Sequence, residues 1–253
     1  MKIKTHRSGR TREQGFSLVE LLVVVLILTT LCAAIFTQID QVLQRAAAEQ
    51  VKVDNFQQAR DFVDQIFRDS RQIGYPNLRT FDVSLAPPSG PWQSPLKNDS
   101  RLAVGLVKVS GTEFQFEGDV DGSGTVSVVS YKTNGNGACA NCLQRAQVSK
   151  VNGDPLTGQT NLKDAAYSDA VQNVQNTTSI FTAYDATGTA LVLPLDNANP
   201  LIADVRVIQV QLTIASPNVV DPKTRQPLQS DIGGRIQILN CSMATTGRSL
   251  TCN

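Results

Sequence analysis

Histidine is almost absent from this chain of 253 residues. The one histidine, His6, lies in a basic segment at the N-terminus. Histidine is the side chain most often used as a general base and as a metal ligand. Its scarcity argues against a nucleophilic triad and against a zinc site. A glycine-rich phosphate loop followed by lysine is missing as well. These absences predict that the protein is not an enzyme.

The chain also lacks an excess of charge of one sign. Lysine and arginine number 23, aspartate and glutamate number 22, and charged residues make up 18% of the sequence. We therefore expect no nucleic-acid partner. The balance hides a local bias, because residues 1–15 contain five of the basic residues and a single acid, Glu13. The remainder of the chain is mildly acidic.

Charge is nearly missing from residues 16–36, which read FSLVELLVVVLILTTLCAAIF. Glu20 is the one charged residue in this segment. A helix that rises about 1.5 Å per residue would cross a bilayer over this length. The basic residues that precede it predict a cytoplasmic N-terminus, with the rest of the chain on the far side of the membrane.

Glycine and proline are missing between residues 16 and 73. After the apolar segment, apolar and small residues recur at steps of three and four, the helical period: Ile39, Val42, Leu43, Ala46, Val53, Phe56, Ala59, Val63, Ile66, Phe67 and Ile73. Gly74 and Pro76 predict that the helix ends at Ile73. A helix of this extent would be about 87 Å long, and it needs lipid or neighbouring helices for its first half and a sheet for its second. A coiled-coil stalk is the alternative.

The order of the N-terminal features is the reverse of that in a secretory signal, where the cleavage site follows the apolar stretch. Here the candidate cleavage site, between Gly15 and Phe16, precedes it. Cleavage would remove the basic leader, residues 1–15, and create an amine about one helical turn from Glu20. A carboxylate in hydrocarbon costs several kcal/mol. We expect that amine to neutralise Glu20 between adjacent subunits and to set their axial register. A signal anchor with a snorkelling or protonated Glu20 is the alternative.

The run GFSLVELLVVVLIL, which starts at Gly15, resembles the processing motif of type IV prepilins and type II secretion pseudopilins. In that family a dedicated aspartic prepilin peptidase cuts after the glycine and N-methylates the new first residue. The resemblance implies that Gly15 is the cleavage glycine, Phe16 the methylated residue and Glu20 the fifth-position glutamate. The family often has a helix-kinking proline near the position of Thr37, so we expect a straighter helix here.

The resemblance also implies the partners and the location. The partners would be other pilins or pseudopilins, through the N-terminal helix, together with the prepilin peptidase, an inner-membrane assembly platform and membrane lipid. The protein would be stored in the bacterial inner membrane as a single-pass subunit with its head outside. After assembly it would belong to a periplasmic or cell-surface filament.

Residues 74–253 predict a β-rich head. Strand signals, set by alternation and β-branched residues, lie at 104–110, 112–118, 125–132, 143–150, 179–185, 190–195, 203–216 and 234–240. We expect the first four to form a meander. In the seventh, Ile208, Val210, Leu212 and Ile214 would face the helix.

The remaining parts of the head have weaker signals. Residues 77–100 are predicted as a loop, 151–177 as a loop with a short helix, and 217–234 as a long exposed excursion. Strands without an alternating βαβ pattern predict an α+β fold in which one long helix packs on an antiparallel sheet, as in the pilin fold. The strand layout resembles the J/W type of minor pilins and pseudopilins.

The run from Asp119 to Gly124, DVDGSG, resembles the first half of a calcium loop. Asp119, Asp121 and Ser123 would supply oxygens at alternate positions. The twelfth position is Ser130, where such loops have a bidentate glutamate, and this departure favours a plain hairpin turn. We expect no cofactor, with Ca²⁺ at this turn as the alternative.

Four cysteines, Cys139, Cys142, Cys241 and Cys252, form an even set in the distal part of the chain. Such a set is expected of a domain that folds in an oxidising compartment. Half a zinc site or a redox pair is the alternative for Cys139 and Cys142. We expect structural disulfides, and proximity in sequence favours the pairs 139–142 and 241–252. A disulfide-bounded C-terminal loop also resembles that of many pilins.

The sequence thus predicts a structural subunit that packs into a filament through residues 16–43. The size of the head favours a minor pilin that caps or primes the filament. A minor pseudopilin of a type II secretion system is the first alternative, and neighbouring genes would discriminate between the two. A filament-tip adhesion or binding module that uses 77–100 or 217–234 is the second.

Overall fold

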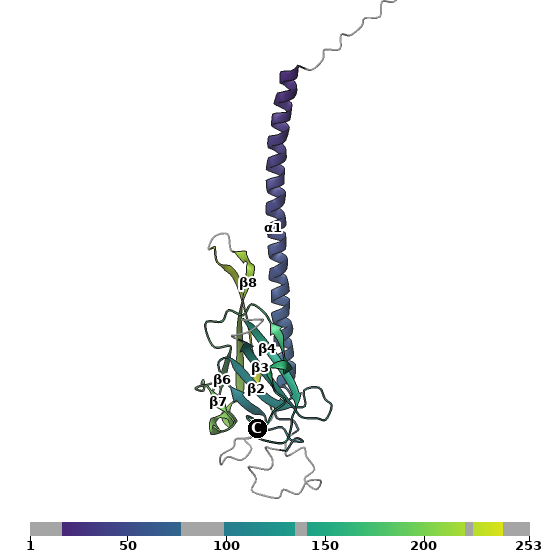
Figure 1. Cartoon of the computed structure of the whole chain (residues 1–253). Coiled ribbons are helices and arrows are strands. Elements are labelled where there is room, and N and C mark those ends of the chain that lie inside the picture. Colours follow the sequence, from purple (N-terminus) through teal and green to yellow (C-terminus); the bar gives the residue numbers. More distant parts are fainter. Residues whose placement is uncertain (1–16, 77–98, 135–140, 221–224, 240–253) are drawn as a thin grey trace, which may run out of the picture. The chain divides into compact units, whose positions relative to one another are not determined.

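The computed structural model describes residues 17–76, 99–134, 141–220 and 225–239 (Figure 1). The chain divides into two compact units, residues 1–50 and residues 51–253, and each is described by itself. The predicted α+β class is confirmed, because one long N-terminal helix is followed by antiparallel sheets.

The described part of the first unit is helical. Helix α1 (Leu18–Ser70) begins here and continues into the second unit. It passes Thr37 without a break, since no proline interrupts its hydrogen bonds there. Every described side chain from 18 to 50 is exposed.

The C-terminal end of α1 lies in the second unit and differs from the prediction. The helix ends at Ser70, three residues before the predicted end at Ile73. The next three N–H groups bond to carbonyls three residues back, and Ile73 then forms a β-bridge with Gly118. The N–H of Gly74 donates to the Glu117 carbonyl oxygen at 2.9 Å. The helix stops early because the edge of a strand offers its backbone new partners.

Within the described residues of the second unit, two antiparallel sheets follow. One has the order β5-β4-β3-β2-β1-β7 and the other the order β6-β8-β9. The strands are β1 (Leu106–Val109), β2 (Glu113–Gly118), β3 (Ser127–Asn134), β4 (Cys142–Ser149), β5 (Tyr167–Val171), β6 (Phe181–Tyr184), β7 (Leu195–Asp196), β8 (Val207–Val220) and β9 (Pro227–Gln237). Short 3₁₀ turns, η2 (Asp164–Ala166) and η3 (Pro200–Asp204), precede β5 and β8. The predicted meander of the first four strands is confirmed.

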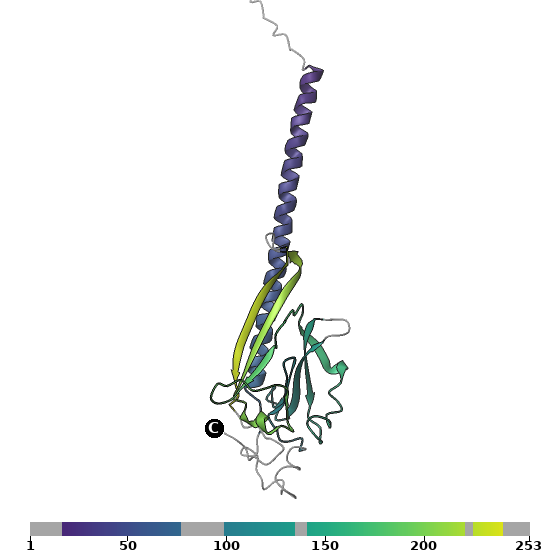
Figure 2. The ribbon, with the colours of Figure 1, turned by 90° about the vertical axis from the view of Figure 1, so that its left-hand side faces the viewer.

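Residues 217–234, predicted as a long exposed excursion without a strand, are largely strand. Strand β8 continues to Val220 and β9 begins at Pro227, so most of this segment belongs to one long hairpin (Figure 2). Strand β5 was also missed, inside the segment predicted as a loop with a short helix. Both segments carry mostly exposed side chains, and their backbones are ordered by ladder hydrogen bonds rather than by a buried apolar face.

The core of the second unit lies between the two sheets and the last turns of α1. The Phe114 ring on β2 lies 5.6 Å from the Phe181 ring on β6, which links the two sheets. The Phe62 ring of α1 meets the Tyr131 ring edge-on at 5.5 Å. The four residues of β8 predicted to face the helix are all buried.

The contact that places β8 and β9 against the helix is made by Phe67. Gly234 of β9 pairs with Val210 of β8, so both positions lie on the same face of the sheet. A Cβ atom added to Gly234 would come within 2.6 Å of the Phe67 ring. The helix therefore packs directly on this face.

The covered stretch of α1 is shorter than its apolar pattern suggests. Ala59, Phe62 and Ile66 are buried, whereas Val53 and Phe56 are 60% and 48% exposed. Among the described residues, the strands of the second unit thus cover the helix only from about residue 58 onward.

Candidate functional site

The first turn of α1 carries the residue singled out by sequence, Glu20. Ser17 precedes the helix, and its carbonyl accepts the Leu21 N–H at 3.1 Å. An acidic side chain in the first turn is favoured by the partial positive charge of the helix N-terminus. Gly15 and Phe16 lie outside the described residues, so their predicted roles stay predictions.

The helix surface around Glu20 is apolar and open. Large apolar side chains between Leu18 and Phe36 are 49–79% exposed. Of the described residues, one helix, α1, contains a stretch that is long and apolar enough to cross a membrane, and none of that stretch is buried. This surface fits a lipid or helix-lined environment far better than water.

The polar groups of this stretch, apart from Glu20, are satisfied within the helix. The Thr29 hydroxyl donates to the Leu26 carbonyl oxygen at 3.0 Å, and the Thr30 hydroxyl donates to that of Ile27 at 2.8 Å. Such bonds remove the cost of placing hydroxyls in hydrocarbon. Within residues 18–36, Glu20 is the one acidic or basic residue, and it has no hydrogen bond or ion pair to another described side chain.

The other end of the helix is held by a charged group that sequence reasoning missed. Asp69 is 7% exposed, and its Oδ2 accepts hydrogen bonds from the Tyr131 hydroxyl at 2.6 Å and from Arg145 Nε at 2.9 Å. Arg145 Nη2 completes an ion pair with the same oxygen at 2.7 Å. Burial, followed by the negative charge of Asp69, raises the pKa of Tyr131 well above its ordinary value. The sequence did indicate that Asp69 is buried, because it follows Ile66 at the three-residue step of the buried helix face.

Lys150 and Glu117 form a second buried ion pair, which no pattern in the sequence predicts. Both side chains are fully buried, and Lys150 Nζ lies 2.7 Å from Glu117 Oε2. Lys150 also donates to the Leu102 carbonyl oxygen, and Glu117 Oε2 accepts the Val104 N–H. Burial raises the pKa of Glu117, and the charge of Lys150 opposes that rise. The pair fixes the segment that leads into β1.

The turn between β2 and β3 contains Asp119, Asp121 and Ser123. Gly122 and Gly124 have positive φ values of 69° and 79°, as a tight turn requires, and these residues connect the antiparallel strands β2 and β3. No group of three or more His, Cys, Asp or Glu side chains that could hold a metal ion occurs in the described ranges.

Of the four distal cysteines, only Cys142 is described. It begins β4 with a fully buried side chain, and it is not among the free thiols of the described residues. Cys139, Cys241 and Cys252 lie outside those residues, so the pairing stays a prediction. Cys32 in α1 is free and exposed.

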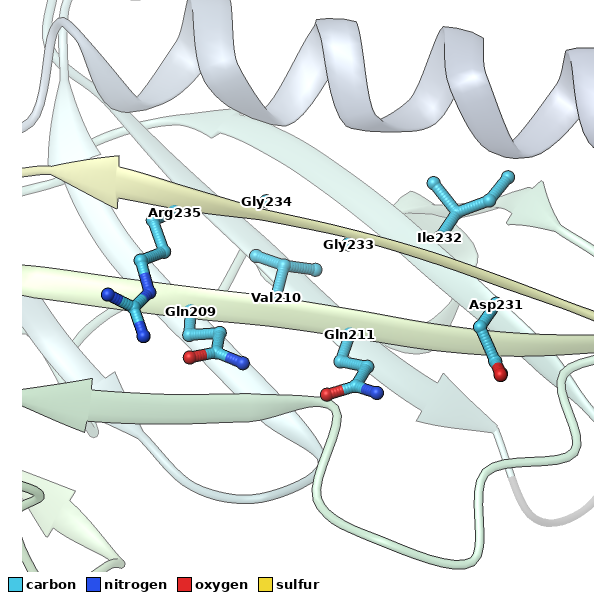
Figure 3. A pocket seen from close by; sticks show the side chains of 8 residues that line it. All are labelled: Gln209, Val210, Gln211, Asp231, Ile232, Gly233, Gly234 and Arg235. Carbon is cyan, nitrogen blue, oxygen red and sulfur yellow. The ribbon is translucent and has the colours of Figure 1, made fainter.

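A pocket of about 260 Å³ lies on the β8–β9 hairpin. In Figure 3 the side chains of Gln209, Gln211, Asp231 and Arg235 point away from α1, and Gly233 leaves a gap between them. The Arg235 guanidinium stacks 5.6 Å from the centre of the Tyr184 ring. The pocket is open and of mixed polar and apolar lining, and no sequence motif coincides with it.

Comparison with known proteins agrees with the N-terminal assignment. A family model described as the prokaryotic N-terminal methylation motif matches residues 10–36. No curated protein and no solved structure matches the chain. The match spans the end of the basic leader, the Gly15–Phe16 junction and the apolar half-helix that carries Glu20.

Proposed function

We propose that this chain, which carries the N-terminal methylation motif of the type IV prepilin and pseudopilin superfamily, is a minor structural subunit of a pilus-type filament. The observation that carries the proposal is the position of Glu20. It is the single charged residue of the exposed apolar stretch that ends at Phe36, and it lies four residues after Phe16, the first residue beyond the junction at which such chains are processed. Members of this superfamily are structural subunits rather than enzymes, and they associate with other pilin subunits and with prepilin peptidase.

The first step is storage in the membrane. The apolar segment has the length of a single span, and its hydroxyl groups are bonded within the helix. The basic leader holds the N-terminus in the cytoplasm, which places the head on the far side of the membrane. The subunit remains there until an assembly platform extracts it.

The second step is processing by the prepilin peptidase after Gly15. The cut removes the basic leader and leaves an amine on Phe16, which is then methylated. Glu20 lies four residues along, about 6 Å of helix rise from that amine. This is the region of α1 that we expect to lie in the filament interior.

The third step is registration between subunits. At about 4 Å in a medium of effective dielectric 20, an ammonium and a carboxylate attract each other by about 4 kcal/mol. A pair between the amine of one subunit and Glu20 of its neighbour satisfies both charges only at one axial offset. The exposed apolar face of α1, including Val42 and Leu43, supplies the remaining contact.

A minor pseudopilin of a type II secretion system would use the same chemistry in another machine. The methylation motif is common to both groups, so the motif supports either assignment. We favour the minor pilin because the second unit carries two sheets and a long hairpin, more than a repeating subunit requires.

The test is to follow processing and incorporation separately in a host with an active prepilin peptidase. Mass spectrometry of the membrane-extracted protein should find methylated phenylalanine at the N-terminus. A Glu20→Ala variant should be cleaved normally yet enter filaments at least about tenfold less, the effect of losing 1.4 kcal/mol or more.

Glu49→Ala is the matched control, because Glu49 is exposed on the same helix beyond the apolar segment. This variant should be incorporated like the natural chain. Recovery of an intact Met1 would refute the processing step. Normal incorporation of Glu20→Ala would refute the charge pair.

A further inference from the structure

The polar side chains of the turn between β2 and β3 accept hydrogen bonds from its own backbone. Asp119 Oδ2 accepts the Gly124 N–H at 2.9 Å, and Asp121 Oδ1 accepts the Ser123 N–H at 3.0 Å. The Ser123 hydroxyl oxygen accepts the Thr125 N–H at 3.3 Å. Three oxygen-bearing side chains at alternate positions are thereby held around one short loop, which Gly124 closes in the left-handed conformation.

One of these oxygens has no partner among the described residues. Asp119 is 5% exposed, and its Oδ1 atom is buried without a hydrogen bond. Oδ2 is bonded across the loop to the Gly124 N–H, so the carboxylate lies at the ring of residues 119–124, and its Oδ1 atom is buried beside Oδ2. A buried carboxylate oxygen that lacks a donor is costly, so the site as described is incomplete.

The charge at this turn is also uncompensated. The Asp119 and Asp121 carboxyl groups stand two positions apart in the same turn, and each accepts a backbone N–H of that turn. Neither forms an ion pair within the described residues, and Lys150 is already paired with Glu117. Two adjacent carboxylates, one of them buried, favour a bound cation over a solvated turn.

We propose that the Asp119–Gly124 turn binds a calcium ion. The ligands are Asp119 Oδ1, the Asp121 carboxylate, the Ser123 hydroxyl and the Thr125 carbonyl, and water completes the shell. Calcium takes six to eight oxygen ligands in flexible geometry, and a glycine at the sixth position is a feature of its loops.

The ligand count sets the expected affinity. Ser130, at the twelfth position, is buried in β3, and its hydroxyl accepts a hydrogen bond from Tyr167. No bidentate carboxylate therefore comes from that position. With two protein carboxylates, the dissociation constant should fall at about 10⁻⁴–10⁻³ M, the range of extracellular calcium modules.

The site is attached to the segment that follows α1. The Asp119 N–H donates to the Tyr75 carbonyl oxygen at 2.8 Å, next to the Gly74–Glu117 bond. A bound ion would fix the end of β2 and, through it, the junction of helix and head. The inference does not depend on the proposed filament role.

The experiment is calorimetric titration of the full chain in detergent with CaCl₂, paired with thermal unfolding. The natural chain should bind one ion with a dissociation constant of about 10⁻⁴–10⁻³ M and melt at a higher temperature in CaCl₂. Asp121→Asn removes one exposed carboxylate without disturbing the core, and it should weaken binding at least about tenfold. Asp119→Asn should abolish it.

Asp185→Asn is the matched control, because Asp185 also closes a surface turn but accepts hydrogen bonds from Thr187 and Thr189 N–H groups. This variant should bind calcium like the natural chain. An equal rise in melting temperature with NaCl at matched ionic strength would overturn the proposal, and so would unchanged binding in Asp121→Asn. A stronger effect of MgCl₂ than of CaCl₂ would overturn the choice of calcium.

Discussion

The Tyr131 hydroxyl donates a 2.6 Å hydrogen bond to Asp69, which joins the last turn of α1 to a central strand of the six-stranded sheet. Arg145, on the neighbouring strand, pairs with the same carboxylate oxygen. The carboxylate thus has two donors, and the helix end is fixed by both. Replacement of either donor should loosen the junction.

Tyr131→Phe should lower the free energy of unfolding by about 1.5–3 kcal/mol, the range for a hydrogen bond to a charged group. Urea denaturation of the full chain in detergent measures this loss. Tyr167→Phe is the matched control, because the Tyr167 hydroxyl donates to a neutral serine and the residue is only partly buried. Equal losses in the two variants would contradict the role of the charge.

Lys150→Met should cost about 3–5 kcal/mol at pH 7, because it leaves Glu117 buried without its cation. Burial raises the pKa of Glu117 above its ordinary value of 4.5, so above that pH the folded chain holds a proton that the unfolded chain releases. The free energy of unfolding therefore falls as pH rises through this range. In Lys150→Met the cation that opposes this rise is gone, so the pKa of Glu117 rises further and stability falls more with pH than in the natural chain. The deficit of Lys150→Met should therefore be smaller at pH 4 than at pH 7.

The control for this prediction is the double variant Lys150→Met, Glu117→Gln, in which neither charge is buried. Its stability should lie closer to that of the natural chain, and its deficit should vary less with pH. Denaturation curves at the two pH values provide the comparison. A deficit of Lys150→Met that is independent of pH would count against the buried carboxylate as its cause.

Gly234→Ala should destabilise the protein by about 1–3 kcal/mol, since the new methyl would lie about 2.6 Å from the Phe67 ring. The same change made in a Phe67→Leu background should cost less, because the smaller side chain leaves room. The four denaturation curves form a double-mutant cycle. Additive losses would show that the two residues do not meet.

Cys32 should resist a membrane-impermeant maleimide in intact cells and react after detergent is added. The thiol is free and exposed on the apolar stretch of α1, so lipid should shield it before assembly. A cysteine introduced by Ala186→Cys, in an exposed turn of the second unit, should react without detergent once the outer envelope is permeabilised. Equal labelling of both positions would contradict the single-pass arrangement.

Much of the fold could be predicted, because burial imposes periodicity. The meander and the apolar positions of β8 alternate in sequence, and the structure buries the same residues. In the outer part of the β8–β9 hairpin, the side chains whose burial the structure describes, such as Val220, are exposed, so alternating buried positions did not mark it as strand. The end of α1 was placed too late for a similar reason: Ile73 keeps the helical spacing, yet its backbone pairs with Gly118.

The polar contacts within the head were harder to predict from the sequence than the candidate site residue Glu20. Glu20 is conspicuous because it interrupts an apolar run, whereas Lys150 and Glu117 are far apart in sequence and meet only through the sheet. The burial of Asp69 was only partly predictable. Its spacing placed it on the buried face of the helix, whereas its charge is typical of a surface residue. Its partners, Tyr131 and Arg145, come from strands that no local pattern connects to the helix.

The threonine hydroxyls in the first half of α1 donate hydrogen bonds to carbonyls of their own helix. Thr29, Thr30 and Thr37 carry the same hydrogen bonds whether lipid tails or protein side chains surround them. In the proposed filament role, transfer from bilayer to filament would leave these hydrogen bonds unchanged, and the apolar surface would exchange lipid for protein neighbours. The free-energy difference between the two states would then depend mainly on one carboxylate, that of Glu20, and a subunit whose Glu20 lacks a partner amine would return to the membrane.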